Sequence, residues 1–307
     1  MANYGQAGES MKGGYHARII ATKVIVYIVC IALTIMAILP FVIMVFSASK
    51  SRFEINSSYL DWAPKITNTL AVSLLPSGHF IENAKYLLFS KTLALPFGRG
   101  FINSAIIAVG ATVLSVYFSA LTAYGFAVYR FKLNKPLYAF IMGIQMVPTQ
   151  VTFISFVEMM FKWHLSNSYI PFILPAIAAP STVFFLRQYM SSALSVEMVE
   201  AGRIDGAGEF GIFNRLVLPI LKPGMATMAI FAMVTNWNNF LIPSLLIDKM
   251  EMSTVPMLVQ KLSGNKYSTE YGAIYFGLTL TAAPLIIFYL LLSKYIIAGV
   301  ALGGVKE

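Results

Sequence analysis

Six apolar stretches, each near the length that a helix needs to cross a lipid bilayer, constrain this sequence most strongly. They lie at residues 24–46, 102–128, 137–160, 169–187, 225–246 and 272–295. A transmembrane helix needs about 20 apolar residues. The composition agrees, because 58% of the 307 residues are hydrophobic and only 11% are charged, against about 25% charged in soluble domains. The sequence therefore predicts an all-α membrane protein with six transmembrane helices.

Prolines interrupt three of these stretches. They are Pro148 in the third, Pro171, Pro175 and Pro180 in the fourth, and Pro284 in the sixth. Neighbouring helices in a membrane can satisfy the carbonyls that a proline frees, so we expect kinked helices. The first stretch, 24–46, exceeds the apolar core of about 7–15 residues in a signal peptide. We therefore expect a retained helix there and not a cleaved leader.

The positive charge of the chain follows the ends of the apolar stretches. The formal net charge is +9, and the basic residues are not gathered on a polar domain, which favours an anionic membrane surface over nucleic acid as their partner. Residues 129–136 form a short turn with Arg130, Lys132 and Lys135. This turn, and a small excess of Lys and Arg over all segments on its side, predict that both termini lie inside, N-in/C-in.

Motifs for catalysis or nucleotide binding are missing from the sequence. It contains no Gly-x-x-x-x-Gly-Lys-[Ser/Thr] phosphate loop, no His-Glu-x-x-His and no Gly-x-Ser-x-Gly. His16, His79 and His164 are far apart and outside the apolar cores, so no metal site is expected. The single cysteine, Cys30, cannot form an internal disulfide. We predict a non-catalytic chain with no cofactor of its own.

A long polar segment, residues 188–224, interrupts the apolar pattern. Ser195 is a plausible N-cap, and Glu197 follows in the first turn, where a carboxylate complements the helix dipole. The glycines in 206–211 allow a bend, and Pro219 is expected to end a second helix. The segment therefore predicts two short helices at the inner membrane surface.

This segment resembles the signature loop of binding-protein-dependent ABC importer permeases. That loop reads Glu-Ala-Ala, three residues, Gly, nine residues, then Ile-x-Leu-Pro. The positions that match are Glu200, Ala201, Gly206, Leu218 and Pro219, while Gly202 replaces the second Ala and Leu216 replaces the Ile. Both replacements keep the size or the hydrophobicity of the side chain.

The resemblance implies a type I ABC importer permease fold, in which this loop is a cytoplasmic coupling helix that docks in a cleft of an ATPase subunit. The implied coupling residues are Glu200, Ala201, Gly202, Arg203, Asp205, Gly206, Ala207, Leu218 and Pro219. Small side chains allow close approach, and Glu200 and Arg203 could pair with opposite charges of the partner. The alternative is an amphipathic interfacial helix without a partner.

Further blocks resemble the sugar-importing branch of that family, in particular the second permease of maltose and multiple-sugar systems. They are residues 101–104, 146–150, 186–188, 237–240 and 299–306. The implied division of the chain is an N-terminal cytoplasmic segment, first helix and long external loop in 1–100, a core permease domain in 101–298, and a cytoplasmic tail in 299–307.

Polar residues inside the third and fifth stretches are candidates for a substrate pathway. They are Gln145, Thr149, Gln150, Asn236, Trp237, Asn238 and Asn239. Polar groups in hydrocarbon usually face the bundle interior or a water-filled cavity, and amides beside an aromatic ring suit sugar hydroxyls. The alternative is that each amide only links neighbouring helices.

Two more sites follow from the resemblance alone. Ser263, Gly264 and Asn265 would contact the binding protein from an external loop, with a plain surface hairpin as the alternative. Val300, Leu302, Gly303, Gly304 and Val305 would enter the interface between the ATPase subunits, with a disordered tail as the alternative.

The implied partners are a homologous permease, two ATPase subunits that bind ATP and Mg²⁺, an extracytoplasmic solute-binding protein, membrane lipid and a sugar. The implied location is a bacterial or archaeal cytoplasmic membrane. Import of an amino acid, peptide or phosphonate stays open. A secondary transporter is disfavoured because the spans hold almost no charged residues, and an intramembrane enzyme lacks a catalytic set.

Overall fold

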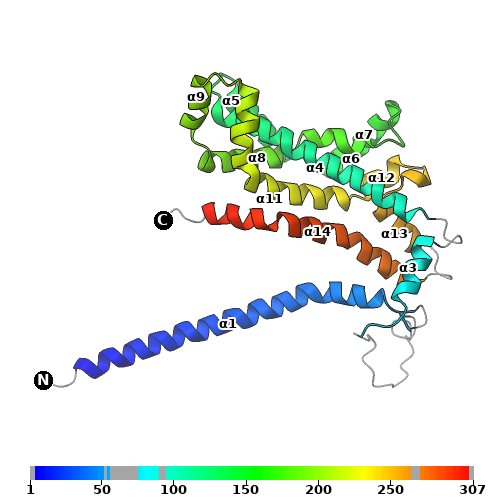
Figure 1. The fold of residues 1–307 in the computed structure, drawn as a ribbon, viewed down its shortest axis with the longest axis horizontal. Coiled ribbons are helices and arrows are strands. Elements are labelled where there is room, and N and C mark those ends of the chain that lie inside the picture. Colours follow the sequence, from blue (N-terminus) through cyan, green and yellow to red (C-terminus); the bar gives the residue numbers. More distant parts are fainter. Residues whose placement is uncertain (1–3, 52–53, 56–74, 90–94, 264–269, 304–307) are drawn as a thin grey trace. The chain divides into compact units, whose positions relative to one another are not determined.

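The structure is a computed structural model that describes residues 4–51, 54–55, 75–89, 95–263 and 270–303, and these residues form helices and turns without strands (Figure 1). By their contacts they fall into two units, Met1–Asn83 with Glu270–Thr279, and Ala84–Thr269 with Leu280–Glu307.

In chain order the helices are α1 (Tyr4–Ser47), α3 (Phe80–Phe89), α4 (Phe97–Val128), α5 (Asn134–Ile144), α6 (Thr149–Lys162), α7 (Ile170–Ile173), α8 (Pro180–Ala193), α9 (Val196–Ile204), α10 (Glu209–Ile212), α11 (Leu218–Trp237), α12 (Leu241–Leu246), α13 (Val255–Ser263) and α14 (Tyr271–Gly303). Two 3₁₀ turns, η1 (Leu174–Ile177) and η3 (Met250–Met252), and a π-helical turn, η2 (Phe213–Val217), join them.

Five helical runs in the described part of the chain are long and apolar enough to cross a membrane. They are Thr22–Ser47, Phe97–Val128, Ile170–Ala193, Glu209–Leu246 and Tyr271–Lys294. They agree with five of the six expected spans, and the chain is therefore a multi-pass membrane protein. The most apolar window of the first run has no buried residue.

The third expected span, 137–160, is two helices. α5 ends at Ile144 and α6 begins at Thr149, with Pro148 as its N-cap residue at ψ 125°. Proline lacks an N–H group and disfavours the α conformation of the residue before it, so the helix stops at this point. Pro284, in contrast, lies inside the continuous α14. The count of six helices stays a prediction.

The second unit is organised around α4. Helices α8 and α11 pack along α4 and against each other, as Figure 1 shows. Many of the buried residues of α4 are small: Ser104, Ala108, Ala111, Ser115, Ser119, Ala120 and Ala123. Small residues let membrane helices approach closely. Close approach also explains Gly224 of α11, where an added Cβ would lie 3.0 Å from the ring of Tyr189.

Asn103, near the start of α4, ties three segments together. Its buried side-chain amide donates to the carbonyl oxygens of Glu251 at 2.8 Å and Ser253 at 2.9 Å, and it accepts a hydrogen bond from the Tyr169 hydroxyl at 2.7 Å. Ser104 next to it accepts the N–H of Val255 at 2.9 Å. These bonds fix η3 and α13 to α4 although about 150 residues separate them.

In the first unit, Asn83 of α3 binds the segment that follows α1. Its side-chain amide donates to the carbonyl oxygens of Ala48 and Lys50, both at 2.9 Å, where the chain leaves α1. A Cβ added at Gly272 would lie 2.2 Å from the Lys50 oxygen, so only glycine fits this crossing. The pKa of Glu54 nearby is lowered, chiefly by the hydrogen bond from the Ser51 N–H, with Ser77 adding a further bond.

Candidate functional site

The predicted coupling segment forms α9, a glycine turn and α10 at one end of the bundle of α4, α8 and α11 (Figure 1). Ser195 occupies the N-cap position as expected, but its hydroxyl donates to the Glu197 carboxylate and caps no backbone N–H. Val199 is the buried residue of α9 and lies in a core cluster with Leu186, Phe213 and Leu221. The other residues of α9, apart from the half-buried Gly202, are exposed.

Gly206 ends α9 in a left-handed conformation with φ 78°. The N–H of Ala207 bonds to the carbonyl of Gly202 at 3.1 Å, and the N–H of Gly206 bonds to that of Arg203 at 3.0 Å. This pair of bonds is the Schellman motif, which requires a positive φ at the position that Gly206 occupies. The signature loop thus favours glycine at position 206 because the backbone there has a positive φ.

Four side chains meet just beyond this turn, and we call them the Glu209 cluster: Arg203, Glu209, Tyr124 and Tyr129. Arg203 Nε donates to Glu209 Oε1 at 2.6 Å, while the hydroxyls of Tyr129 and Tyr124 donate to Oε2, the latter at 3.3 Å. The Arg203 guanidinium also lies 5.5 Å from the centre of the Tyr129 ring. The cluster therefore connects α9 and α10 to the end of α4.

The electrostatics of the Glu209 cluster follow from these contacts. The hydrogen bond to Glu209 is the main cause that raises the pKa of Arg203 above its usual value. Burial, followed by the hydrogen bond to Glu209, raises the pKa of Tyr129. At neutral pH the cluster is thus an ion pair with two neutral phenols. Because Arg203 is engaged within the chain, its expected pairing with an acidic group of a partner would have to compete with Glu209.

The other expected coupling residues separate into two groups. Glu200, Ala201, Asp205 and Ala207 are exposed on and after α9. Gly202 is turned inward, because a Cβ there would lie 3.3 Å from Ile212 of α10, so its small size serves packing within the loop.

The expectation that Pro219 ends a second helix is wrong. This proline lies with Leu218 in the first turn of α11, which continues to Trp237. The helical run continues from η2 through Pro219 into α11, so the proline lies within this run.

Sequence reasoning missed two large apolar side chains that the loop exposes. Ile204 is 86% exposed and Phe210 is 66% exposed, on the two sides of the Gly206 turn. Two large apolar side chains at the tip of a polar loop were a readable signal for a binding surface. Glu209, Tyr124 and Tyr129 were also missed, because partners 80 or more residues apart leave no local pattern.

Among the described side chains, no hydrogen bond joins the predicted pathway residues of the third stretch to those of the fifth. Gln145 follows α5 as its C-cap residue, with Nε2 3.3 Å from Met142 Sδ, and Thr149 begins α6. Gln150 lies in α6, but its side chain is outside the described ones. Asn236 donates to the carbonyl of Ala232 on its own helix at 2.8 Å. Asn238, which follows α11, is exposed, while Asn239 is partly buried.

Trp237 is a packed side chain in this conformation. It is 3% exposed, lies in a cluster with Ala108 and Met233, and its indole N–H donates to the Thr281 carbonyl at 3.0 Å. The ring therefore offers no face to a passing solute here, and its role in a pathway stays a prediction.

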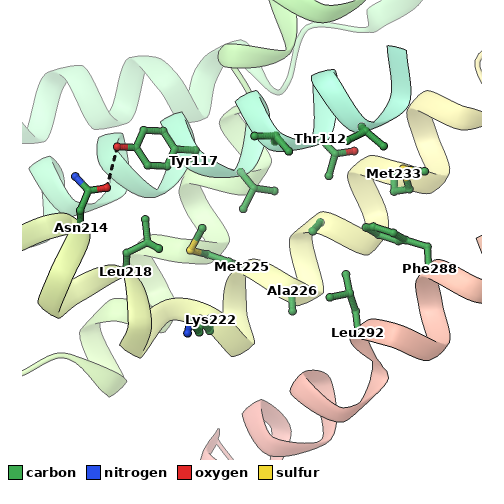
Figure 2. Close-up of a pocket in the computed structure, with 14 residues that line it drawn as sticks. Thr112, Tyr117, Asn214, Leu218, Lys222, Met225, Ala226, Met233, Phe288 and Leu292 are labelled. Carbon is green, nitrogen blue, oxygen red and sulfur yellow. Dashed lines mark hydrogen bonds between the residues drawn. The ribbon is translucent and has the colours of Figure 1, made fainter. Parts of the chain in front are cut away.

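A cavity of about 540 Å³ lies between α4, α11 and α14. Figure 2 shows Tyr117 and Asn214 at one end, joined by a hydrogen bond of 3.0 Å, and Met233 and Phe288 at the other. The lining is mainly apolar, which suits apolar side chains better than a hydroxyl-rich solute. None of the predicted pathway residues with described side chains lines it.

Two other predicted sites lie largely outside the described residues. Gly264 and Asn265 are outside them, and Ser263 is the last residue of α13. The predicted tail begins as helix, because α14 continues through Val300 and Leu302 to Gly303. Gly304 and Val305 are outside the described part of the chain.

Long apolar helices around a small-residue core, with a helix–glycine–helix loop exposed at one end, define a multi-pass membrane protein. Residues 115–301 match the family described as "Binding-protein-dependent transport system inner membrane component", and the chain belongs to this family. It is thus a membrane-embedded component of a binding-protein-dependent transport system.

Relatives share most of the chain. The arabinooligosaccharides transport system permease protein AraQ of Halalkalibacterium halodurans is 35% identical over 253 residues, 78% of this chain and 90% of that protein. AraQ of Bacillus subtilis is 37% identical over 208 residues, covering 68% and 73%. The lactose transport system permease protein LacG of Rhizobium radiobacter is 32% identical over 206 residues, covering 67% and 74%.

The fold is shared with a solved transporter. A chain in the crystal structure of a bacterial ABC transporter involved in the import of the acidic polysaccharide alginate superimposes with a TM-score of 0.72. The match covers 90% of this chain and 96% of that chain at 18% identity. At this identity the likeness establishes the fold, that of an ABC permease.

Proposed function

We propose that this chain is a transmembrane permease subunit of an ATP-driven importer for a sugar or oligosaccharide. The observation that carries the proposal is the exposed apolar tip of the α9–α10 loop, Ile204 and Phe210, on a loop held rigid by Gly206 and Glu209. Exposed apolar side chains on a rigid support are typical of a protein interaction surface. The sugar assignment is supported by the names of the AraQ and LacG relatives.

The proposed topology has six crossings with both termini inside. The broken pair α5 and α6 would make one crossing, since unwound backbone at membrane depth is tolerated where protein or a water-filled cavity surrounds it. The membrane would be a bacterial or archaeal cytoplasmic membrane. The basic turn at 129–136 would then face the cytoplasm with α9.

The proposed complex contains a homologous permease, two ATPase subunits and an external solute-binding protein. ATP and Mg²⁺ would be bound by the ATPase subunits. Their closure would move the coupling helices of the two permeases together and open the solute route between the permeases to the outside. This chain would catalyse no reaction. It would transmit the movement from α9 through Val199 and the Glu209 cluster to α8, α11 and α4.

The proposed solute route would form between the two permeases. Gln145, Thr149, Gln150 and the amides of 236–239 would line it, with Trp237 fixing the end of α11 through Thr281. At the end of α13 and directly after it, Ser263, Gly264 and Asn265 would contact the binding protein. The tail residues Val300, Leu302, Gly303, Gly304 and Val305 would reach the ATPase interface.

The experiment is to express the chain with its partner subunits and to measure both ATPase copurification and solute uptake. Ile204→Ser and Phe210→Ser should reduce both, while Val196→Ser, an exposed apolar residue at the other end of α9, should change them little. Full copurification and uptake with both variants would disprove the docking role.

Labelled arabinooligosaccharides, lactose, an amino acid and sn-glycerol 3-phosphate should be compared as solutes in the same assay. The last is included because a relative that is 28% identical is named an sn-glycerol-3-phosphate transport permease. Uptake of only a non-sugar solute would overturn the sugar assignment and leave the permease assignment intact.

A further inference from the structure

A basic turn follows directly where the second candidate span ends. That span ends at Val128, and Arg130, Lys132 and Lys135 lie within the next seven residues. Between them stand Phe131, 43% exposed, and Leu133, 60% exposed. Cations that alternate with exposed apolar side chains at the end of a span lie at the boundary between lipid headgroups and acyl chains, whichever leaflet the turn faces.

The turn is held in one shape by its own contacts. Asn134 donates its side-chain amide to the carbonyl oxygens of Phe126 at 3.2 Å and Tyr129 at 2.9 Å. The rings of Phe126 and Phe131 have centroids 6.1 Å apart. The turn encloses an open concavity of about 710 Å³, lined by Phe126, Ala127, Tyr129, Arg130, Phe131, Lys132, Asn134, Lys135 and Pro136. All three cations therefore border one prearranged hollow.

The charge of this hollow is not balanced by the chain. The sequence contains no Asp or Glu between Glu82 and Glu158. Within the part of the chain that the structure describes, none of the three cations forms an ion pair. Glu209 reaches the turn through the Tyr129 hydroxyl, but it is already paired with Arg203. Three positive charges thus border a hollow whose lining contains no acidic side chain.

We propose that this turn, residues 129–136, binds an anionic phospholipid. Its phosphate would be held by Arg130, Lys132 and Lys135, and its acyl chains would lie beside Phe131 and Leu133. A lipid fits better than a soluble acidic protein surface, because only a lipid offers an anion and a hydrocarbon chain side by side at the end of a span. The inference is independent of the transported solute.

The test is native mass spectrometry of the full transporter complex in detergent, titrated with phosphatidylglycerol or with phosphatidylcholine. The triple variant Arg130→Gln, Lys132→Gln, Lys135→Gln is compared with the matched control Arg99→Gln, Lys249→Gln, Lys261→Gln. The control removes the same kinds of charge, including one at the opposite end of α4. Inorganic phosphate is added as a competitor in a separate series.

The intact complex should bind phosphatidylglycerol. The affinity should fall on the order of a hundredfold in the triple variant, because each cation near an anionic surface contributes about fivefold. The control should retain the lipid, and phosphatidylcholine should bind neither protein tightly. Equal lipid binding by the triple variant, equal loss in the control, or displacement by phosphate alone would overturn the proposal. So would retained lipid with loss of an ATPase subunit, which would assign the turn to a protein contact.

Discussion

Arg203 at the end of α9 donates to Glu209 at the start of α10 over 2.6 Å, so the two side chains bridge the left-handed turn at Gly206. Tyr129 and Tyr124 bind the other carboxylate oxygen of Glu209 from the end of α4. A movement of α9 can thus be transmitted to α4 through these polar contacts, in addition to the apolar contact through Val199.

The first prediction concerns Glu209. Glu209→Ala should lower transport-coupled ATP hydrolysis and leave the melting temperature nearly unchanged, because the pair with Arg203 is partly exposed and such pairs contribute little to folding. The control is Glu197→Ala, which loses a carboxylate of α9 that bonds Ser195 within its own turn. The measurement is the amount of ATP hydrolysed per solute transported. If this ratio is the same in both variants as in the unchanged transporter, the cluster does not have this role.

The second prediction compares two glycines of the same turn. Gly206→Ala should cost roughly 1–2 kcal/mol, since a Cβ is unfavourable in the left-handed region. Gly208→Ala should be nearly neutral, because its φ is −68° and nothing lies within 4 Å of an added Cβ. Thermal unfolding and uptake of the two variants measure the difference. Identical behaviour would show that the turn adapts to a side chain.

The third prediction concerns the segment after α12. Asn103→Ala should destabilise the protein by about 2–4 kcal/mol, because it leaves the bonded groups of Glu251, Ser253 and Tyr169 without this partner. Hydrogen exchange should rise in residues 250–258. Thr122→Ala is the control on the same helix, since that hydroxyl bonds only one turn back to Phe118. Unchanged exchange in 250–258 would contradict the prediction.

The fourth prediction separates packing from solute contact near the end of α11. Trp237→Phe should lower stability by about 1 kcal/mol through the lost bond to Thr281, with little change in the KM of uptake. Asn238→Ala should raise KM and leave the melting temperature nearly unchanged, because Asn238 is exposed. The reverse pattern would mean that the indole itself meets the solute.

The sequence alone determined the features that depend on local pattern. Apolar runs of about 20 residues predicted five of the helical runs that could cross a membrane, because a helix needs about this length to cross the hydrocarbon core. The spacing from Glu200 to Pro219 predicted the family that residues 115–301 match, and the bend expected around Gly206 is a left-handed turn in the structure. These features can be predicted without knowing which other segments of the chain pack against them.

Only the tertiary structure decided the features that depend on neighbours. Pro148 breaks a span whereas Pro284 remains inside a helix. Gly202 faces Ile212, although the family resemblance implied that its small size serves docking to a partner. The Glu209 cluster joins residues 80 or more apart, which meet because α4 and α10 pack at the same end of one bundle. Chain-local preferences set where a helix begins and ends, whereas the packing of the helices sets which side chains meet.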